Sequence, residues 1–255
     1  MKLYHVTDKR SIHLIKKLGI KPQIGDRSMM VNEKEPAIYL CSFDSIQYWR
    51  IILGLDAAVI EVNDDSVSDK RAYSYGGKLY DEFIHFKHIS KDNIRVMDSN
   101  EWDTKESYEE AMKNLCYACI SSLSSFCVSC IRYYNRVFNN GSCHTDDDKS
   151  INILTIRANS IIKSYANILD YSLLSKEDII KYLVSEGDSG EYTICDKYGN
   201  TNKRLYQMLI EYPKDGFYDT RKEIYDYIVK TFDGCLETDT GGYIPEEENY
   251  VWKEI

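Results

Sequence analysis

The sequence predicts an α+β protein in which short strands come first and helices follow. Within residues 1–98, short apolar and β-branched runs alternate with turn residues, as strands joined by tight connections do. Beyond residue 98, apolar residues recur at steps of three and four, which is the period of helices packed on one face. The change of period falls at residues 98–104. We therefore expect two domains, residues 1–98 and a mainly helical region over residues 99–255.

The elements of the first domain can be placed in chain order. Strands are expected at residues 2–6, 37–41, 57–62, 82–86 and 94–97, and helices at residues 11–18 and 43–53. Gly19 suits the left-handed position that ends a helix, and the Ser42 hydroxyl suits a helix N-cap. The segments 21–35 and 63–77 are expected to be loops.

The second region reads as a series of helices. They are expected at residues 108–138, 151–169, 175–184, 203–212 and 221–232, with a candidate strand at 191–198. Ser175 followed by Asp178 is typical of a helix start in which the hydroxyl accepts from the backbone three residues on.

Four of the eight cysteines have the spacing of a paired zinc knuckle. Knuckles turn sharply at Gly or Pro, and residues 108–138 contain neither. The cysteines instead share one apolar face of the expected helix, so they cannot converge on a tetrahedral ion. We therefore expect reduced core cysteines, a reducing compartment and no metal site. The four are Cys116, Cys119, Cys127 and Cys130.

Composition and charge limit the classes of partner. No stretch approaches the ~20 apolar residues of a membrane span, and no signal peptide begins the chain, so we expect a cytoplasmic protein with no membrane partner. Residues 1–99 carry 15 Lys and Arg against 14 Asp and Glu, which leaves 17 against 27 for the rest. An acidic second half repels phosphate backbones, so a protein target is expected rather than a nucleic acid.

Three residues occur in an order that has a chemical meaning. His5 lies on the first expected strand, Tyr39 on the second, and Glu82 begins a later one. This order resembles the ADP-ribosyltransferase superfamily, in particular its His-Tyr-Glu branch, over about the first hundred residues. The resemblance implies a split β-sheet core that binds NAD⁺ as a substrate. That fold needs no Rossmann or Walker glycine motif, and the sequence has neither.

The resemblance also implies a role for each site residue. Glu82 would hold the nicotinamide ribose and stabilise its cation, Tyr39 would stack on nicotinamide, and His5 would bind the adenosine ribose. These three are the expected catalytic residues. Further NAD⁺ contacts are expected from the neighbour of His5, from loop residues near the pyrophosphate and from a second aromatic wall: Thr7, Arg27, Ser28, and Tyr48 or Trp49.

Each of these residues also has a structural interpretation. A histidine in a first strand is more often structural than functional, and Tyr39 is one of 22 tyrosines. Asp81 precedes Glu82, and strand alternation puts the two carboxylates on opposite faces, so either could be the active one. The Glu-x-Glu pair of the arginine-specific branch is missing, because Tyr80 stands two residues before Glu82.

The expected function is transfer of ADP-ribose from NAD⁺ to a macromolecule, as a toxin or an effector in conflict between phage and host. Such a protein would be expected to need a partner that acts as an antidote, or else to act only briefly. Three alternatives remain: hydrolysis of NAD⁺ in the same pocket, RNA 2′-phosphotransfer on the same architecture, and an inactive binding module. The first strand lacks the arginine expected next to the histidine of a phosphotransferase.

Overall fold

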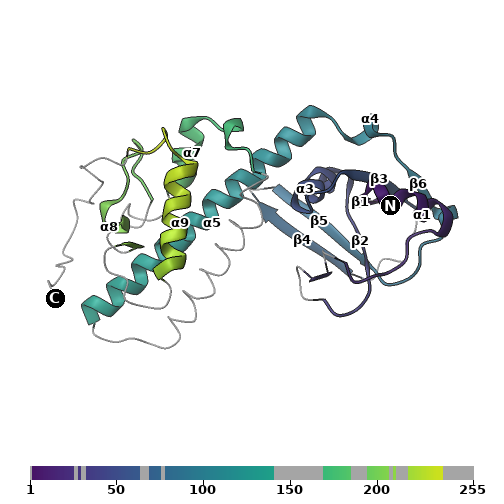
Figure 1. Cartoon of the computed structure of the whole chain (residues 1–255), viewed down its shortest axis with the longest axis horizontal. Helices are drawn as coiled ribbons and strands as arrows, with labels where there is room; N and C mark the ends of the chain where they lie inside the picture. The colour runs from purple at the N-terminus through teal and green to yellow at the C-terminus, as the bar shows by residue number, and fades with distance from the viewer. Residues whose placement is uncertain are drawn as a thin grey trace. The chain divides into compact units, whose positions relative to one another are not determined.

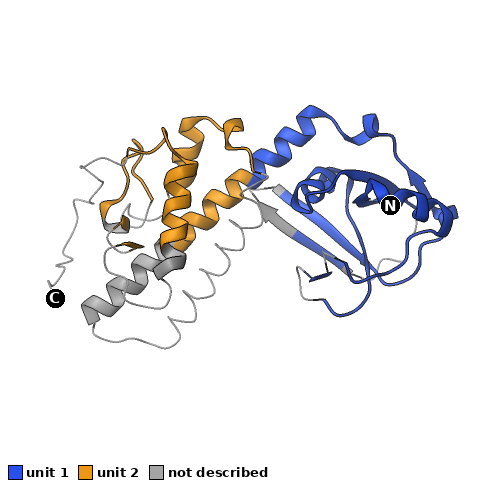
Figure 2. Cartoon of the chain, viewed as in Figure 1, with its two compact units in different colours: residues 1–115 blue, residues 116–255 orange. Residues whose placement is uncertain are grey.

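The structure is a computed structural model. It describes residues 2–25, 28–29, 33–63, 69–75, 78–140, 169–184, 194–206, 209–210 and 218–237. The chain forms two compact units, residues 1–115 and 116–255 (Figure 2). Helices and small antiparallel sheets make up the fold, which confirms the α+β class (Figure 1). The division between these units lies inside a long helix, and the two domains expected from the sequence, 1–98 and 99–255, stay a prediction.

The first unit contains two three-stranded antiparallel sheets. One has the order β1-β3-β6 and the other the order β2-β5-β4. Their bounds are β1 Leu3–Asp8, β3 Ala57–Val62, β6 Ile94–Val96, β2 Ile38–Leu40, β5 Lys78–His85 and β4 Asp69–Tyr75. An isolated antiparallel bridge between Tyr4 and Cys41 joins β1 to β2, so the two sheets meet at that point.

Both sheets bury apolar side chains in one core. β3 pairs with β1 and β6, and its residues Val59, Ile60 and Val62 are fully buried. Burial of such a side chain stabilises a fold by roughly 1.5–3 kcal/mol. The core cluster comprises Leu3, Ile15, Ile20, Ile38, Leu40, Ile60, Val62, Phe83 and Ile89.

Short helices connect the strands of the first unit. After β1 come η1 (Lys9–Ser11) and α1 (Ile12–Leu18), and after β2 come η2 (Phe43–Ser45) and α3 (Ile46–Ile52). η3 (Lys91–Asn93) precedes β6, and α4 (Ser99–Trp102) follows it. The Ser42 side chain caps nothing: its Oγ lies 3.0 Å from Ser45 Oγ instead.

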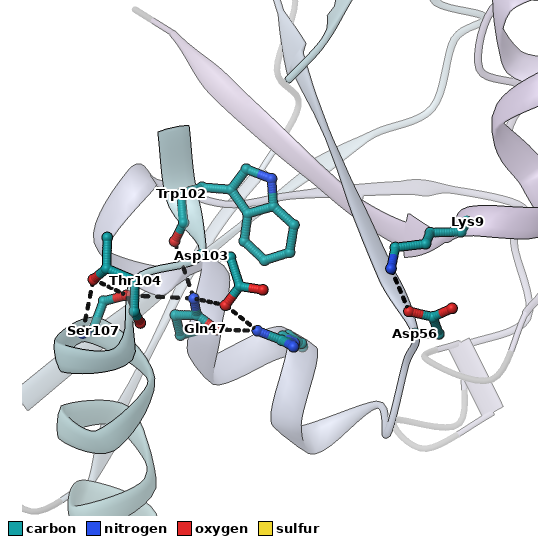
Figure 3. Close-up of polar contacts among 8 residues, drawn as sticks. Lys9, Gln47, Asp56, Trp102, Asp103, Thr104 and Ser107 are labelled. Carbon is teal, nitrogen blue, oxygen red and sulfur yellow. Dashed lines mark hydrogen bonds and ion pairs between the residues drawn. The ribbon is translucent and has the colours of Figure 1, made fainter. Parts of the chain in front are cut away.

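Helix α3 is tied to the segment that leads into the long helix α5 (Lys105–Asn140) (Figure 3). Gln47 donates to the Trp102 carbonyl at 3.0 Å, and the Arg50 guanidinium pairs with Asp103. The same guanidinium lies over the ring of Trp102, 5.5 Å from its centre. Arg50 thus holds α3 to this segment in two ways, through the ion pair with Asp103 and through the contact of its cation with the Trp102 ring.

Helix α5 confirms the single helix predicted for the cysteine-rich segment. In the second unit Cys116 and Cys119 are buried on one face of it, and the Tyr171 hydroxyl lies 3.1 Å from the Cys119 sulfur. The Tyr171 and Tyr227 hydroxyls are 3.0 Å apart. The other described helices are η4 (Tyr171–Leu173), α7 (Lys176–Leu183), α8 (Lys203–Tyr206) and α9 (Tyr218–Thr231).

Several sequence predictions need correction. The segment 63–77 contains strand β4, and β5 begins at Lys78 rather than at Glu82 and excludes Phe86. Strand β4 begins with three charged residues, and its pairing with β5 along the whole of its length holds it in the sheet. In the segment 191–198 the described residues form a bridge and a turn rather than a strand. The helix expected at 151–169 lies outside the described residues apart from its last residue, which is not helical. Ser175 does cap α7 by accepting from the Asp178 amide.

Gly19 ends α1 with a backbone that only glycine adopts readily. Its φ is 76° and its ψ is −170°. A Cβ there would lie 2.2 Å from the Ile89 carbonyl oxygen, because Ile20 and Ile89 form a close backbone bridge.

We expect Gly19→Ala to lower the free energy of unfolding by about 3 kcal/mol, from backbone strain and the clash together. Urea denaturation measures the change. Gly54→Ala is the matched control, since Gly54 also has a positive φ but no atom near its Cβ position. Equal losses in the two variants would contradict the expected clash.

Candidate active site

The candidate site forms where β1 and β2 separate. The two strands exchange backbone hydrogen bonds between Tyr4 and Cys41, at 2.9 and 2.8 Å. β1 then continues along β3, whereas β2 continues along β5. His5 stands next to this bridge, and its Nδ1 lies 2.9 Å from the Tyr39 carbonyl oxygen.

A small pocket lies at this separation, with a cavity volume of about 40 Å³. Residues of β1, β2, β5 and α3, or directly next to these elements, line it. They are Tyr4, His5, Val6, Tyr39, Leu40, Cys41, Trp49, Leu53 and Glu82. The structure thus brings together the three expected catalytic residues, His5, Tyr39 and Glu82, with one of the two expected aromatic walls, Trp49.

The hydrogen bond of His5 determines which ring nitrogen carries the proton. A carbonyl oxygen only accepts, so Nδ1 donates to Tyr39 and Nε2 of the neutral ring is an acceptor. Burial lowers the pKa of His5 below its usual value, and the hydrogen bond to the carbonyl opposes this in part. The ring is therefore neutral at pH 7 and can accept a hydrogen bond from a ligand hydroxyl.

The Tyr39 hydroxyl is held by the segment that precedes β2. It lies 3.1 Å from both Ser28 Oγ and Glu33 Oε2. The other Glu33 oxygen pairs with the Arg71 guanidinium. Burial raises the pKa of Tyr39, and the nearby charges of Glu33 and Glu82 add to the increase. The phenol therefore stays protonated, and its hydroxyl is fixed by these two contacts.

Glu82 is only 1% exposed and stands in the centre of the second sheet. Arg71 of β4 is directly paired with it, and residues paired across antiparallel strands point to the same face. Burial raises the pKa of the Cys41 thiol, and the charge of Glu82 raises it further, so this carboxylate lies within electrostatic reach of Cys41. Cys41 lines the same pocket.

Asp81 makes different contacts. Its carboxylate lies 3.4 Å from Lys70 Nζ, its carbonyl accepts from Trp49 Nε1 at 3.0 Å, and its amide donates to Ser45 Oγ at 2.9 Å. Its side chain does not line the pocket. Alternation along β5 thus separates the two carboxylates as expected, with Glu82 at the pocket and Asp81 fixing α3 to the sheet.

Two of the expected contact residues, Tyr48 and Thr7, do not line the pocket. Tyr48 is buried and stacks on Tyr80, with ring centres 4.2 Å apart, so Trp49 forms the aromatic wall. Thr7 is half-buried opposite Ala58 and does not line the pocket. Arg27 lies outside the described residues. Ser28 is buried and touches the site through the Tyr39 hydroxyl.

Sequence reasoning missed three residues at this site: Glu33, Arg71 and Cys41. Arg71 was overlooked because its segment reads as a polar loop. Two glycines between Tyr75 and Lys78 are a typical hairpin connection, and this signal indicates that β4 and β5 pair. Glu33 and Cys41 carry no local signal of this kind.

No family model matches the sequence, and none of the curated proteins or solved structures compared with it is significantly similar. Among the described residues, no group of histidine, cysteine or acidic side chains is arranged to hold a metal ion. Within the same residues, every helix is too short or too polar to cross a membrane.

The lowered pKa of His5 predicts how stability depends on pH. The neutral ring is favoured in the fold, so its contribution is complete above the unfolded pKa of about 6.5 and is lost as pH falls below it. We expect the wild type to lose more stability than His5→Gln between pH 7.5 and 5.5, measured by urea denaturation. His13→Gln, at an exposed position of α1, is the control. Parallel pH curves for wild type and His5→Gln would contradict the assignment.

Proposed function

We propose that this protein is an ADP-ribosyltransferase, which cleaves NAD⁺ at the nicotinamide–ribose bond and transfers ADP-ribose to a macromolecule. One observation carries the proposal: His5, Tyr39 and the buried Glu82, from three strands, line one pocket together with Trp49. The proposed core is the split sheet of this superfamily. The two three-stranded sheets joined at Tyr4 and Cys41 support it.

The chemistry of the bond explains why these groups suffice. Nicotinamide leaves as a neutral molecule with the electron pair of the broken bond, so no strong acid is needed. The ribose carbon becomes oxocarbenium-like, and a buried carboxylate such as Glu82 stabilises that charge. The acceptor's nucleophilic atom then bonds to this carbon and loses its proton.

The reaction also requires that NAD⁺ be held in a fixed orientation. Tyr39 and Trp49 would hold the nicotinamide ring between aromatic surfaces. Nε2 of His5 would accept a hydrogen bond from a hydroxyl of the adenosine ribose, since its tautomer is fixed by the Tyr39 carbonyl. Fixed donors and acceptors lower the barrier by holding the reacting carbon towards the acceptor.

The pocket must widen to admit the substrate. A volume of about 40 Å³ holds only a few water molecules, which is less than a nicotinamide ring requires. Contacts of the Tyr39 hydroxyl with Ser28 and Glu33 hold the side chain of this pocket residue in place. Release of these contacts is therefore part of the proposed binding step.

The carboxylate assignment can be tested with a pair of neighbouring variants. We expect Glu82→Gln to reduce NAD⁺ cleavage by about a hundredfold or more, because the amide cannot stabilise the cation. Asp81→Asn is the matched control and should keep activity near wild type, since Asp81 pairs with Lys70 away from the pocket. The assay measures nicotinamide release from NAD⁺ in cell lysate, with melting temperatures to exclude unfolding.

The products distinguish the related functions. Label from NAD⁺ on a macromolecule supports transfer, and free ADP-ribose in place of labelled macromolecule indicates hydrolysis by the same pocket. An active Glu82→Gln with an inactive Asp81→Asn would show that the carboxylate is misassigned. Wild-type protein that leaves NAD⁺ intact would overturn the proposal in favour of a binding module.

A further inference from the structure

One ion pair beside the pocket is not explained by the bond cleavage itself. Arg71 of β4 pairs with Glu33, whose second oxygen hydrogen-bonds the Tyr39 hydroxyl. The Glu33 side chain is 16% exposed and the Arg71 side chain 34% exposed, so the pair is partly open to solvent. The Arg71 guanidinium is therefore accessible to a ligand from solvent.

The position of Arg71 relates it to the proposed substrate. It is paired with Glu82 in the β4–β5 register, and paired residues lie about 5 Å apart at their Cα atoms. None of the described residues that line the pocket is lysine or arginine. A dinucleotide carries two negative phosphates between its riboses, and a cation close to the pocket is needed to offset them.

We propose that Arg71 binds the pyrophosphate of the dinucleotide and that Glu33 occupies Arg71 until the substrate displaces it. The inference rests on the proposed function, since it names a substrate contact for that reaction. Guanidinium matches phosphate oxygens with two parallel hydrogen bonds, so the exchange replaces one charged partner by another. Loss of the Glu33 contact also releases the Tyr39 hydroxyl, which links phosphate binding to opening of the pocket.

The effect of removing Glu33 on ligand affinity differs between this proposal and a purely structural ion pair. If Glu33 only supported the fold, its loss would leave ligand affinity unchanged or reduce it. If Glu33 competes with the ligand for Arg71, its loss raises affinity. A gain in affinity cannot arise from a damaged fold, so the sign of the Glu33 effect separates the two interpretations.

The test measures binding of ADP-ribose by calorimetry, because this ligand contains the pyrophosphate but no bond to nicotinamide. We expect Arg71→Gln to weaken binding about tenfold or more, through loss of a charge-assisted contact. Glu33→Gln should tighten binding about two- to fivefold, because a partly exposed ion pair opposes the ligand only modestly.

The neighbouring ion pair supplies matched controls. Lys70 is next to Arg71 on β4 but faces the other side of the sheet, where it pairs with Asp81. Lys70→Gln and Asp81→Asn change charge by the same amounts as the two test variants and should bind ADP-ribose within about twofold of wild type. If the control variants change ADP-ribose affinity as much as the test variants do, the changes come from overall charge and the inference fails.

The outcomes separate this inference from the proposed function. ADP-ribose binding that depends on Arg71 and Glu33 as expected supports the inference even if NAD⁺ is not cleaved, which is the failure of the proposed function alone. Cleavage of NAD⁺ with ADP-ribose affinity indifferent to Arg71 overturns the inference alone. A wild type that does not bind ADP-ribose overturns it as well.

Discussion

The backbone bridge between Tyr4 and Cys41 is the interaction on which the site depends. Its two hydrogen bonds hold β1 against β2 at one point, and each strand then pairs with a different partner. If the two strands stayed paired beyond this bridge, the backbones would fill the space between them. Their separation instead leaves a gap that side chains of both sheets line, and this gap is the pocket.

The side chains around this gap are fixed by hydrogen bonds to other parts of the unit. His5 is held by a backbone carbonyl of β2, and Trp49 is held by a backbone carbonyl of β5. Helix α3 is further tied to the sheet by Ser45 and to the start of α5 by Gln47. Groups fixed by the fold lose little freedom when a ligand binds, which favours both affinity and orientation.

The sequence predicted much of the first unit because its strands are locally distinctive. β1 and β3 are rich in branched and aromatic residues, and both lie close to the predicted ranges. β4 was missed since its polar residues have no strand pattern of their own and depend on pairing with β5. The convergence of His5 and Glu82 follows from pairing between distant segments, which a local pattern can suggest only through a known family order.

In the second unit, the length of each sequence pattern determined how well a helix could be predicted. The apolar face of α5 was visible in the spacing of its cysteines, because a helix of this length repeats its pattern many times. α7 was predicted from a single cap, Ser175, whose hydrogen bond to the next turn is a local interaction. Of the helix predicted at 203–212, the structure describes α8 and a helical turn at residues 209–210, and the other predicted residues lie outside the described ranges.

The reactivity of the Cys41 thiol should report how often the pocket opens. Burial, and to a smaller extent the charge of the neighbouring Glu82, raises the pKa of this thiol and keeps the sulfur in the unreactive protonated form. An alkylating reagent can therefore attack this sulfur only during moments when the gap between the sheets is open to solvent. The rate at which Cys41 is alkylated thus measures how often this gap opens, with no added fluorophore.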